Sequence, residues 1–402
     1  MRKWYGFVAA AVGAAVVLGA CSSSKTTSSN TTASAGSSAT TATGAGQPLK
    51  IAYMSILSGP YASPGSDNAF KLAVSEINAN GGIMGRQIEY KEFNTDITPQ
   101  GAVTATDLAL QYKPDLVIGY GVSAGLKASA SALNSAGVVV IHNTLDSITS
   151  PTSMGSQLTF RLSLTVAQNA TGADNFLFQT QNVKKMTVIN TSDSAPSDGA
   201  TQILSEAKTA GVATQHFVVS PAVTDLTAPV LAAKSFPADA IWEWGYPTTD
   251  GLLIKTAAAN GYNGDIMTFS AQSAAALGLI PKTLLTNKIF SIPVSCAPEV
   301  LNTAAAQKYD AAYTAKYGTA PTSAVANENY DAVYLYMNAV QQAKSFDAHA
   351  VATALGNLDY QGVCGEEKSD SNHNLLHSLA LLTFPNSTES LAKLVTNIPS
   401  PY

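Results

Sequence analysis

The sequence has few charged residues, few cysteines and no apolar run long enough to cross a bilayer. Charged residues make up 12% of the 402 residues, the net charge is −5, and Lys and Arg form no basic stripe. Nucleic acid is therefore excluded as a partner, because its phosphates require clustered basic side chains. The sequence also lacks a Walker motif and a dinucleotide-binding fingerprint, so we expect no cofactor.

The N-terminus has the pattern of a signal peptide. Arg2 and Lys3 precede an apolar run of small residues from Phe7 to Ala20, which is too short to span a membrane. The run ends in Leu18-Gly19-Ala20-Cys21, which resembles the bacterial lipobox, where the cysteine becomes the lipidated first residue of the mature protein. We expect residues 1–20 to be cleaved and Cys21 to be lipidated; a buried cysteine behind an ordinary secretory signal is the alternative.

The segment after the lipobox predicts a tether. Residues 22–46 are Ser, Thr, Ala and Gly apart from Lys25 and Asn30, so no apolar side chain offsets the entropy cost of ordering them. We therefore interpret residues 21–48 as a lipidated cysteine followed by a disordered linker. The working domain is expected at the extracytoplasmic face of a cell membrane.

From residue 49 onward, short β-rich runs alternate with helical patterns, which is typical of parallel α/β sheets. The pattern occurs twice, so we predict two similar Rossmann-like lobes rather than one large core. The first set has expected strands at 49–56, 87–93, 116–119 and 138–142 and helices at 68–79, 101–112 and 124–136. The second set has expected strands at 186–190, 213–219, 240–244, 266–269 and 289–293 and helices at 199–210 and 250–259.

Three segments of the first set resemble the type I periplasmic binding proteins of the leucine/isoleucine/valine-binding family. They are Ile51-Ala52-Tyr53 leading into Leu57-Ser58-Gly59-Pro60-Tyr61, then Ile77-Asn78-Ala79-Asn80-Gly81-Gly82-Ile83-Met84-Gly85-Arg86, then Asp96 with Pro99 and Ala102. Similarity continues through 115–119, 136–138 and Tyr246, so it covers nearly the whole chain from Leu49.

The resemblance implies a monomeric solute-binding protein that closes on a small ligand and delivers it to an ABC permease. Open parallel sheets bind ligands at the carboxyl ends of their strands, which agrees with a cleft between two such edges. The implied hinge has three crossing segments. Lobe one is expected at 49–162 plus 297–363, and lobe two at 163–296 plus 364–402.

Lobe one offers polar loops after its strands. Ser123 opens a helix and, at the family position for the ligand carboxylate, can bind an anion together with Ala124; capping of its own helix is the alternative. Thr144 and Asp146 follow the next strand, and Asp146 lies near the position at which the family contacts the ligand's ammonium group. Asp146 either neutralises an ammonium group or caps the turn at 147–149. Tyr61 either walls the ligand or lies on the surface.

Lobe two contributes Pro196, Trp244, Tyr246 and Gln272, each just after a strand, and Tyr246 matches a ligand-contacting position of the family. Two departures matter: Ser194-Ala195-Pro196 stands where amino-acid binders commonly have Tyr, and Gln272 stands where many have Glu. Without that acid, Asp146 must pair with the ammonium group, or the ligand is not a standard α-amino acid. Trp242 and Trp244 face the same side of one strand, which also fits packing under a helix.

Two other functions compete with solute binding. Gly121-Val122-Ser123-Ala124-Gly125 fits the nucleophile elbow of a serine hydrolase, but no histidine follows in the expected arrangement and the oxyanion motif is missing. A sensor domain that reports to a receptor uses the same fold. His373 and His377 have i, i+4 spacing but lack the Glu of a zinc motif, so we expect no metal and interpret this segment as a solvated loop. The protein is expected not to be an enzyme.

Cys296 and Cys364 remain after lipidation of Cys21, and the exported location permits a disulfide. In the implied topology, the second crossing follows 289–293 and the third lies near 360–365, side by side at the hinge. We therefore predict a bond between Cys296 and Cys364; two free thiols in separate lobes are the alternative.

Replacing the lipobox cysteine tests the anchor. Cys21→Ser should release the protein into the soluble exported fraction without unfolding it, because only the lipid holds it at the membrane. Fractionation of cells that express the variant measures this. A variant that still partitions with membranes contradicts lipid anchoring.

Overall fold

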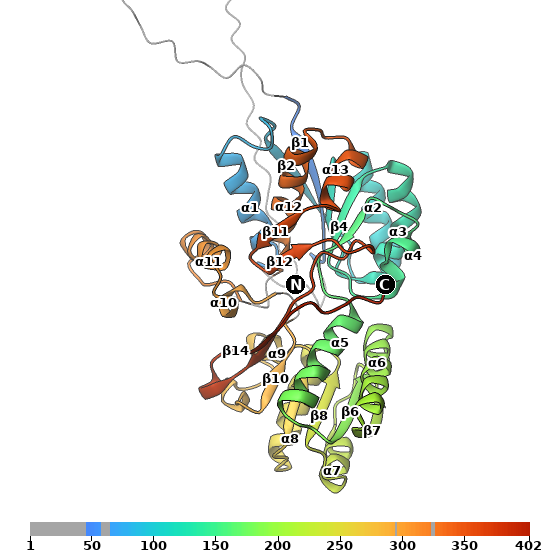
Figure 1. The fold of residues 1–402 in the computed structure, drawn as a ribbon, viewed down its shortest axis with the longest axis vertical. Coiled ribbons are helices and arrows are strands. Elements are labelled where there is room, and N and C mark those ends of the chain that lie inside the picture. Colours follow the sequence, from blue (N-terminus) through green and yellow to red (C-terminus); the bar gives the residue numbers. More distant parts are fainter. Residues whose placement is uncertain (1–45, 58–64, 294–295, 323–325) are drawn as a thin grey trace, which may run out of the picture. The chain divides into compact units, whose positions relative to one another are not determined.

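A computed structural model describes residues 46–57, 65–293, 296–322 and 326–402. These residues belong to one compact unit with two large sheets (Figure 1). The first sheet has the order β2-β1-β3-β4-β5 and is parallel throughout. The second has the order β14-β13-β10-β9-β8-β6-β7, in which β13 pairs antiparallel with both β10 and β14 and the other neighbours are parallel. The expected α/β fold with two lobes is confirmed.

Up to β10, the helices and strands that the sequence predicts lie close to their observed positions. Lobe one is built from β1 (Leu49–Ser55), α1 (Asn68–Ala79), β2 (Ile88–Asn94), α2 (Pro99–Gln111), β3 (Leu116–Gly119), α3 (Ser123–Ala136), β4 (Val139–His142), α4 (Pro151–Met154) and β5 (Thr159–Arg161). Lobe two is built from α5 (Val166–Asn175), β6 (Lys185–Thr191), α6 (Ser194–Ala210), β7 (Ala213–Val219), α7 (Thr227–Ser235), β8 (Ala240–Trp244), α8 (Pro247–Ala259), β9 (Asp265–Thr268), α9 (Ala271–Ala276) and β10 (Ile289–Ser291).

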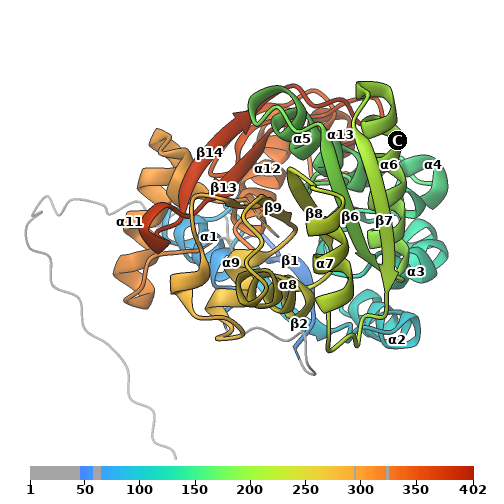
Figure 2. The same cartoon turned by 90° about the horizontal axis from the view of Figure 1, so that it is seen from below.

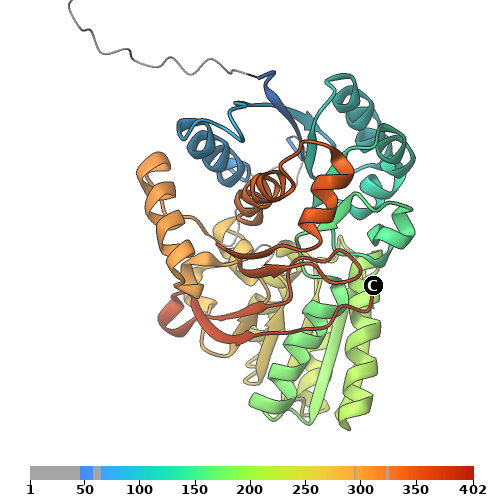
Figure 3. The ribbon, with the colours of Figure 1, turned by 45° about the horizontal axis from the view of Figure 1, so that its top comes forward.

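The remaining elements follow β10. They are α10 (Pro298–Leu301), α11 (Ala304–Tyr317), α12 (Glu328–Ala343), α13 (Ala348–Leu355), β11 (Asp359–Gly362), β12 (Gly365–Lys368), β13 (Leu379–Thr383) and β14 (Ser390–Val395). Helix α12 packs against both α1 and α13 (Figure 3). No helix within the described residues is long and apolar enough to span a membrane.

Each sheet is covered by helices on both faces, so its central strands are apolar on both sides. In β1, Leu49, Ile51 and Tyr53 join the core formed with α1 and α12, whereas Ala52 and Met54 join the core formed with α2 and α3. Lobe two repeats this arrangement, with α5 and α6 on one face of the sheet and α7 and α8 on the other (Figure 2). Strands buried on both faces give the short apolar runs from which they were predicted.

The end of β3 shows how the sequence starts a ligand loop. Gly119 has φ of 115°, and a Cβ there would lie 2.0 Å from the carbonyl oxygen of Met54 on the neighbouring strand. Only glycine fits so close to another backbone in this conformation. The chain therefore leaves the sheet at this residue and enters α3 at Ser123.

The chain from β11 to Tyr402 runs past the edges of both sheets. Gly365–Lys368 pairs with Asp359–Gly362 as a hairpin, so the expected boundary after residue 363 falls inside this hairpin. Asn374 continues beside Arg161 of β5, and pairing with the lobe-two sheet resumes only at Leu379. After β14 the chain returns to the segment 374–377. The N–H of Ile398 donates to the carbonyl of His377, and the side chain of Asn374 donates to the carbonyl of Tyr402.

The segment around His373 and His377 is not a solvated loop, and that prediction is wrong. Leu375 and Leu376 between them are buried, and the ring of His373 stacks on Phe160 with a centroid distance of 4.3 Å. The prediction was based on the many Ser, Asp and Asn residues of this segment and overlooked the two leucines that become buried. This segment packs against the edge of the lobe-one sheet.

The expected disulfide between Cys296 and Cys364 is present, with a Cα–Cα distance of 5.2 Å. The first turns of α12 hold both half-cystines. The side-chain amide of Asn327 donates to the carbonyl of Cys296 at 3.0 Å, and the carboxylate of Asp331 accepts from the backbone N–H groups of Val363 and Cys364 at 3.0 Å. The second and third crossings are therefore fastened to one helix and to each other.

Removing the disulfide should destabilise the fold. The bond closes a loop with a sequence separation of 68 residues, which restricts the unfolded chain, so the Cys296→Ala/Cys364→Ala double variant should lose about 4 kcal/mol of unfolding free energy. Urea unfolding of both proteins measures the difference. Two reactive thiols in non-reduced, denatured wild-type protein would show that the bond does not form.

Candidate functional site

Two of the predicted ligand residues meet at the carboxyl edge of the lobe-one sheet. Strands β3 and β4 are neighbours in parallel register, so the loops that follow them lie side by side. Ser123 is the first residue of α3, and its Oγ accepts a hydrogen bond from the backbone N–H of Asp146 at 3.5 Å. Both residues are buried, with 8% and 6% of their surface exposed.

Neither side chain makes the capping interaction that was the alternative. The N-cap of α3 is Val122, with no side-chain hydrogen bond, so Ser123 does not cap its helix. Asp146 precedes the 3₁₀ turn Ser147–Thr149 and also makes no side-chain cap bond. Capping therefore does not explain the presence of these polar side chains.

The carboxyl group of Asp146 is buried with one oxygen unpaired, and its pKa is raised. Its Oδ1 is buried and has no hydrogen-bond partner. Burial raises the pKa of Asp146 above its ordinary value, a hydrogen bond with Ser123 opposes this rise, Asp198 adds to it, and the charge of Arg161 opposes it. A buried carboxylate oxygen without a donor is costly, and a cationic group in the site would supply the missing partner.

The other predicted residues of lobe one have different surroundings. Thr144 points into the protein, where its Oγ1 lies 2.9 Å from Nδ1 of His142 and 2.7 Å from Oγ1 of Thr149. Ala124 is exposed in the first turn of α3. Tyr61 and Cys21 lie outside the described residues.

In lobe two, only Tyr246 retains the expected character of a loop residue. It is half-buried between β8 and α8, and its N–H donates to Oγ1 of Thr249 at 2.8 Å. Trp244 is 2% exposed and stacks between Trp242 and Phe269. A Cβ at Gly199 of α6 would lie 2.5 Å from its ring. Trp244 thus packs under a helix, which was the alternative to a ligand platform.

Pro196 and Gln272 are also integrated into helices. Pro196 is buried in the first turn of α6, where proline is tolerated because the N–H would have no helical partner; the helix begins at Ser194 rather than at Gly199 as expected. Gln272 lies in the first turn of α9, where its Oε1 accepts from Oγ of Ser291 at 2.6 Å. Its amide is thus engaged with the end of β10.

A pair of acids beneath the lobe-two edge was missed. Glu243 of β8 and Asp250 of α8 are both fully buried, and Oγ of Ser270 donates to Asp250 at 2.5 Å. Burial and the nearby charge of Asp250 raise the pKa of Glu243 far above its ordinary value, and burial also raises the pKa of Asp250. The sequence does not predict this pair, because Glu243 is a single acid in an otherwise apolar strand.

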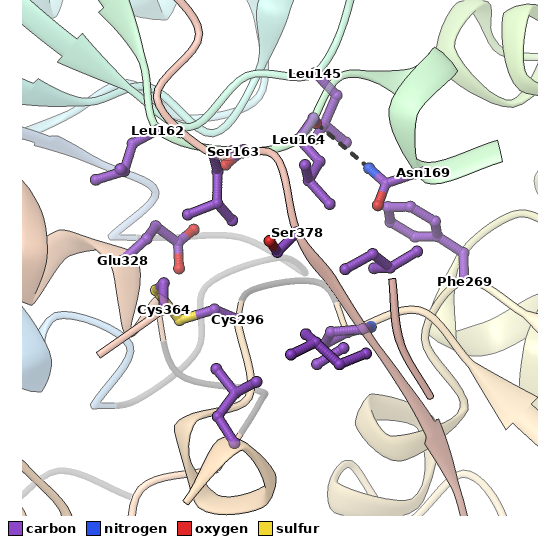
Figure 4. Close-up of a pocket in the computed structure, with 16 residues that line it drawn as sticks. Leu145, Leu162, Ser163, Leu164, Asn169, Phe269, Cys296, Glu328, Cys364 and Ser378 are labelled. Carbon is purple, nitrogen blue, oxygen red and sulfur yellow. Dashed lines mark hydrogen bonds between the residues drawn. A yellow bond between two sulfur atoms is a disulfide. The ribbon is translucent and has the colours of Figure 1, made fainter. Parts of the chain in front are cut away.

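A cavity lies where the crossing segments meet (Figure 4). Its lining includes Leu145 from the loop after β4, Phe269 after β9, and both Cys296 and Cys364. None of the predicted ligand residues that the structure describes lies in the lining. This apolar cavity belongs to the hinge, whereas the polar groups that suit a small solute lie at the strand ends.

The N-terminal turn of α12 connects the hinge to the ligand loop, and the sequence did not reveal it. Asn143, the first residue after β4, donates to Oε1 of Glu328 at 3.1 Å and to Oδ1 of Asn329 at 2.9 Å. Asn329 in turn donates to the hydroxyl of Tyr53 on β1. Burial raises the pKa of Glu328 to about 8.

One group of potential metal ligands occurs among the described residues. Asp331, Cys364 and Glu367 place ligand atoms within 4.8 Å of one another. The sulfur of Cys364 is bonded to Cys296, and only a thiolate is a good metal ligand. Burial and the charge of Asp331 raise the pKa of Glu367, and burial raises that of Asp331 to about 6. Both carboxyl groups are thus shifted toward their neutral forms, which are poor metal ligands.

Comparison with known proteins places the chain. The sequence pattern that defines the periplasmic binding protein family matches residues 48–388. The chain belongs to the periplasmic binding protein family. The type I resemblance to leucine/isoleucine/valine-binding proteins is thereby confirmed, and the family name agrees with an extracytoplasmic location.

Relatives of this periplasmic binding protein include proteins of different bacteria. The leucine-, isoleucine-, valine-, threonine- and alanine-binding protein of Pseudomonas aeruginosa is 22% identical over 335 residues, covering 81% of this chain and 88% of the relative. The crystal structure of the branched-chain amino acid transporter substrate-binding protein of Streptococcus pneumoniae, in complex with isoleucine, has a TM-score of 0.75 at 24% identity and covers 87% of this chain and 99% of its own.

Another similar fold carries a different ligand class in its name. The fatty acid ABC transporter substrate-binding protein of Thermomonospora curvata has a TM-score of 0.71 at 18% identity, covering 87% of this chain and 92% of its own. The fold therefore accommodates more than one ligand chemistry. The ligand of this chain has to be argued from its own side chains.

Glu328 should make stability depend on pH. Its pKa of about 8 lies above the ordinary value, so the fold favours its neutral form, and the unfolding free energy contributed by Glu328 falls as pH rises from about 4.5 to 8. The variant Glu328→Gln does not show this loss. The unfolding free energy of the variant minus that of wild type should therefore be at least about 1 kcal/mol larger at pH 8 than at pH 5. Urea unfolding at both pH values measures it. The exposed Glu366→Gln is the control, and equal behaviour of the two variants would refute the assignment.

Proposed function

We propose that the protein is a lipid-anchored, extracytoplasmic solute-binding protein that captures a small polar ligand between its lobes and delivers it to an ABC permease. The ligand is an amino acid, or an amide or small acid related to one. The observation that carries this proposal is the pairing of Ser123 with Asp146 at the carboxyl edge of the lobe-one sheet. The relatives with known ligands in their names support the same class of function.

The two residues suit the two oppositely charged groups of an amino acid. Ser123 opens α3, where backbone N–H groups of the first turn and a hydroxyl favour a carboxylate. Asp146 presents a buried carboxylate oxygen without a partner, which favours an ammonium group. Asp146 thereby takes the role of the acid that is absent at Gln272.

This chemistry argues against a fatty acid. A long acyl chain requires an extended apolar groove and no buried acid near its carboxylate, because two like charges repel strongly where water is excluded. Asp146 lies within hydrogen-bonding reach of the residue that would hold that carboxylate. A ligand that carries both a positive and a negative group satisfies both side chains.

Lobe two supplies the opposing wall in this proposal. Tyr246 stands between β8 and the N-terminus of α8, at the carboxyl edge of its sheet. Closure of the hinge would bring this edge onto a ligand bound by lobe one, and a permease would recognise the closed state. The lipid at Cys21 and the linker would keep the protein near its permease.

A serine hydrolase receives no support from the geometry. Among the described residues, no histidine nitrogen lies within hydrogen-bonding distance of Oγ of Ser123, and the nearest loop partner is the N–H of Asp146. His142, on the neighbouring strand, bonds to Thr144 instead. Activation of a serine nucleophile requires a base in contact with its hydroxyl.

Truncating Ser123 tests the proposal. Ser123→Ala should weaken ligand binding by about 1–3 kcal/mol, the usual cost of a lost hydrogen bond to a charged group, and should leave the Tm without ligand nearly unchanged. The ligand is first identified by native mass spectrometry of gently purified protein, and calorimetry then gives the Kd of both proteins. Ester hydrolysis by wild type that disappears in Ser123→Ala would overturn the assignment in favour of an enzyme.

A further inference from the structure

The loop after β4, residues 143–149, is held from the protein interior by Arg161. This residue ends β5, the strand next to β4. Its Nη2 donates to the carbonyl oxygen of Asp146 at 2.8 Å and to Oγ1 of Thr149 at 3.1 Å, and its Nη1 donates to the carbonyl oxygen of Leu145 at 3.4 Å. One planar guanidinium thus fixes three successive parts of the loop that carries Asp146.

Arg161 is buried without an acidic partner at contact distance. Only 2% of its surface is exposed, its Nε has no hydrogen-bond partner, and none of the ion pairs among the described residues includes it. Burial lowers its pKa only to about 10, so it keeps its charge at neutral pH. The ring of Tyr402 covers the guanidinium at 5.7 Å.

Burying the guanidinium of Arg161 carries a desolvation cost. A buried charge normally pairs with an opposite charge, but here the guanidinium binds neutral carbonyl and hydroxyl oxygens of the loop. The titratable or charged groups that influence Asp146 are Arg161 on β5 and Asp198 on α6, with Ser123 on α3 as its hydrogen-bond partner. The charge of Asp146 also raises the pKa of Tyr402, and the charge of Arg161 lowers the pKa of His142 on β4. The charge of Asp370 raises the pKa of Arg161.

We propose that Arg161 is a positioning residue for the ligand. It holds residues 143–149 so that the carboxylate of Asp146 meets the ligand's amino group, and its positive charge favours the ionised form of that carboxylate. This inference rests on the proposed function. It explains why a guanidinium is buried beneath a binding loop rather than paired with a surface acid, as Arg86 is with Asp115.

The two parts of this role are separable by substitution. Arg161→Lys keeps the charge but lacks the planar fork that reaches three acceptors, whereas Arg161→Gln removes the charge. Arg86→Gln is the matched control, because Arg86 supports the lobe-one sheet through Asp115 and the carbonyls of Gln47 and Pro48. These contacts lie at the start of β1 and not at the ligand edge.

The experiment measures the Kd for L-leucine and L-isoleucine by calorimetry between about pH 4 and 8. Binding of an ammonium group requires ionised Asp146, so affinity falls as pH drops through the pKa of Asp146. Both Arg161 variants should bind roughly 10–100-fold more weakly at neutral pH. In Arg161→Gln the acid loss should also move to higher pH, because the carboxylate has lost its cation; in Arg161→Lys and Arg86→Gln it should stay at the wild-type position.

A second readout separates this inference from the proposed function. Carbon-13 NMR of the Asp146 carboxyl in ligand-free protein should show a higher pKa in Arg161→Gln than in wild type or Arg86→Gln. If wild type binds neither amino acid while this shift appears, leucine and isoleucine fall as ligands and the coupling of Arg161 to Asp146 stands. An unchanged Asp146 pKa, or folded Arg161 variants with wild-type Kd values, would overturn the inference. If Arg161→Gln fails to fold, the test uses Arg161→Lys alone, and wild-type affinity of that variant would overturn the inference.

Discussion

The arrangement depends on the grip of one helix end on segments from distant parts of the chain. Asn327 and Asp331, one helical turn apart, hold the backbone on both sides of the hinge disulfide. Glu328 and Asn329, between them, bind Asn143 at the start of the ligand loop. Buried hydrogen bonds in which one carboxylate accepts from two donors, as at Asp331, are strong and directional. Hinge geometry and ligand loop are therefore fixed by the same turn.

The candidate ligand site repeats this logic on a smaller scale. Parallel strands bring Ser123 and Asp146 together, and Arg161 supports the loop from within. The hydroxyl of Thr144 is bonded to Thr149 in the interior, whereas Asp146 keeps a carboxylate oxygen without a partner. A loop that is held in place and carries an unpaired contact group is preorganised for a ligand that supplies the missing donor. This contrast is the physical basis for assigning a cationic group to the ligand.

The sequence predicted the parts of the fold that depend on local pattern. Strands such as Leu116–Gly119 and Ala213–Val219 were found because apolar or β-branched runs between turn signals identify them. The return of residues 364–378 to the lobe-one edge was missed, because their partners, such as Arg161, lie some two hundred positions away. Trp244 and Gln272 follow strands as expected, but packing against Gly199 and Ser291 decides where they point. A strand-end position alone does not reveal such neighbours.

The central claim is that one small ligand is held by the carboxyl edges of both sheets. Hydrogen–deuterium exchange tests it most directly, with protein that carries its co-purified ligand compared with the same protein after the ligand has been removed by unfolding and refolding. The account predicts slower exchange with ligand both in residues 143–149 of lobe one and in the turn around Tyr246 of lobe two. Protection confined to one lobe, or centred on the apolar hinge cavity instead, would contradict it.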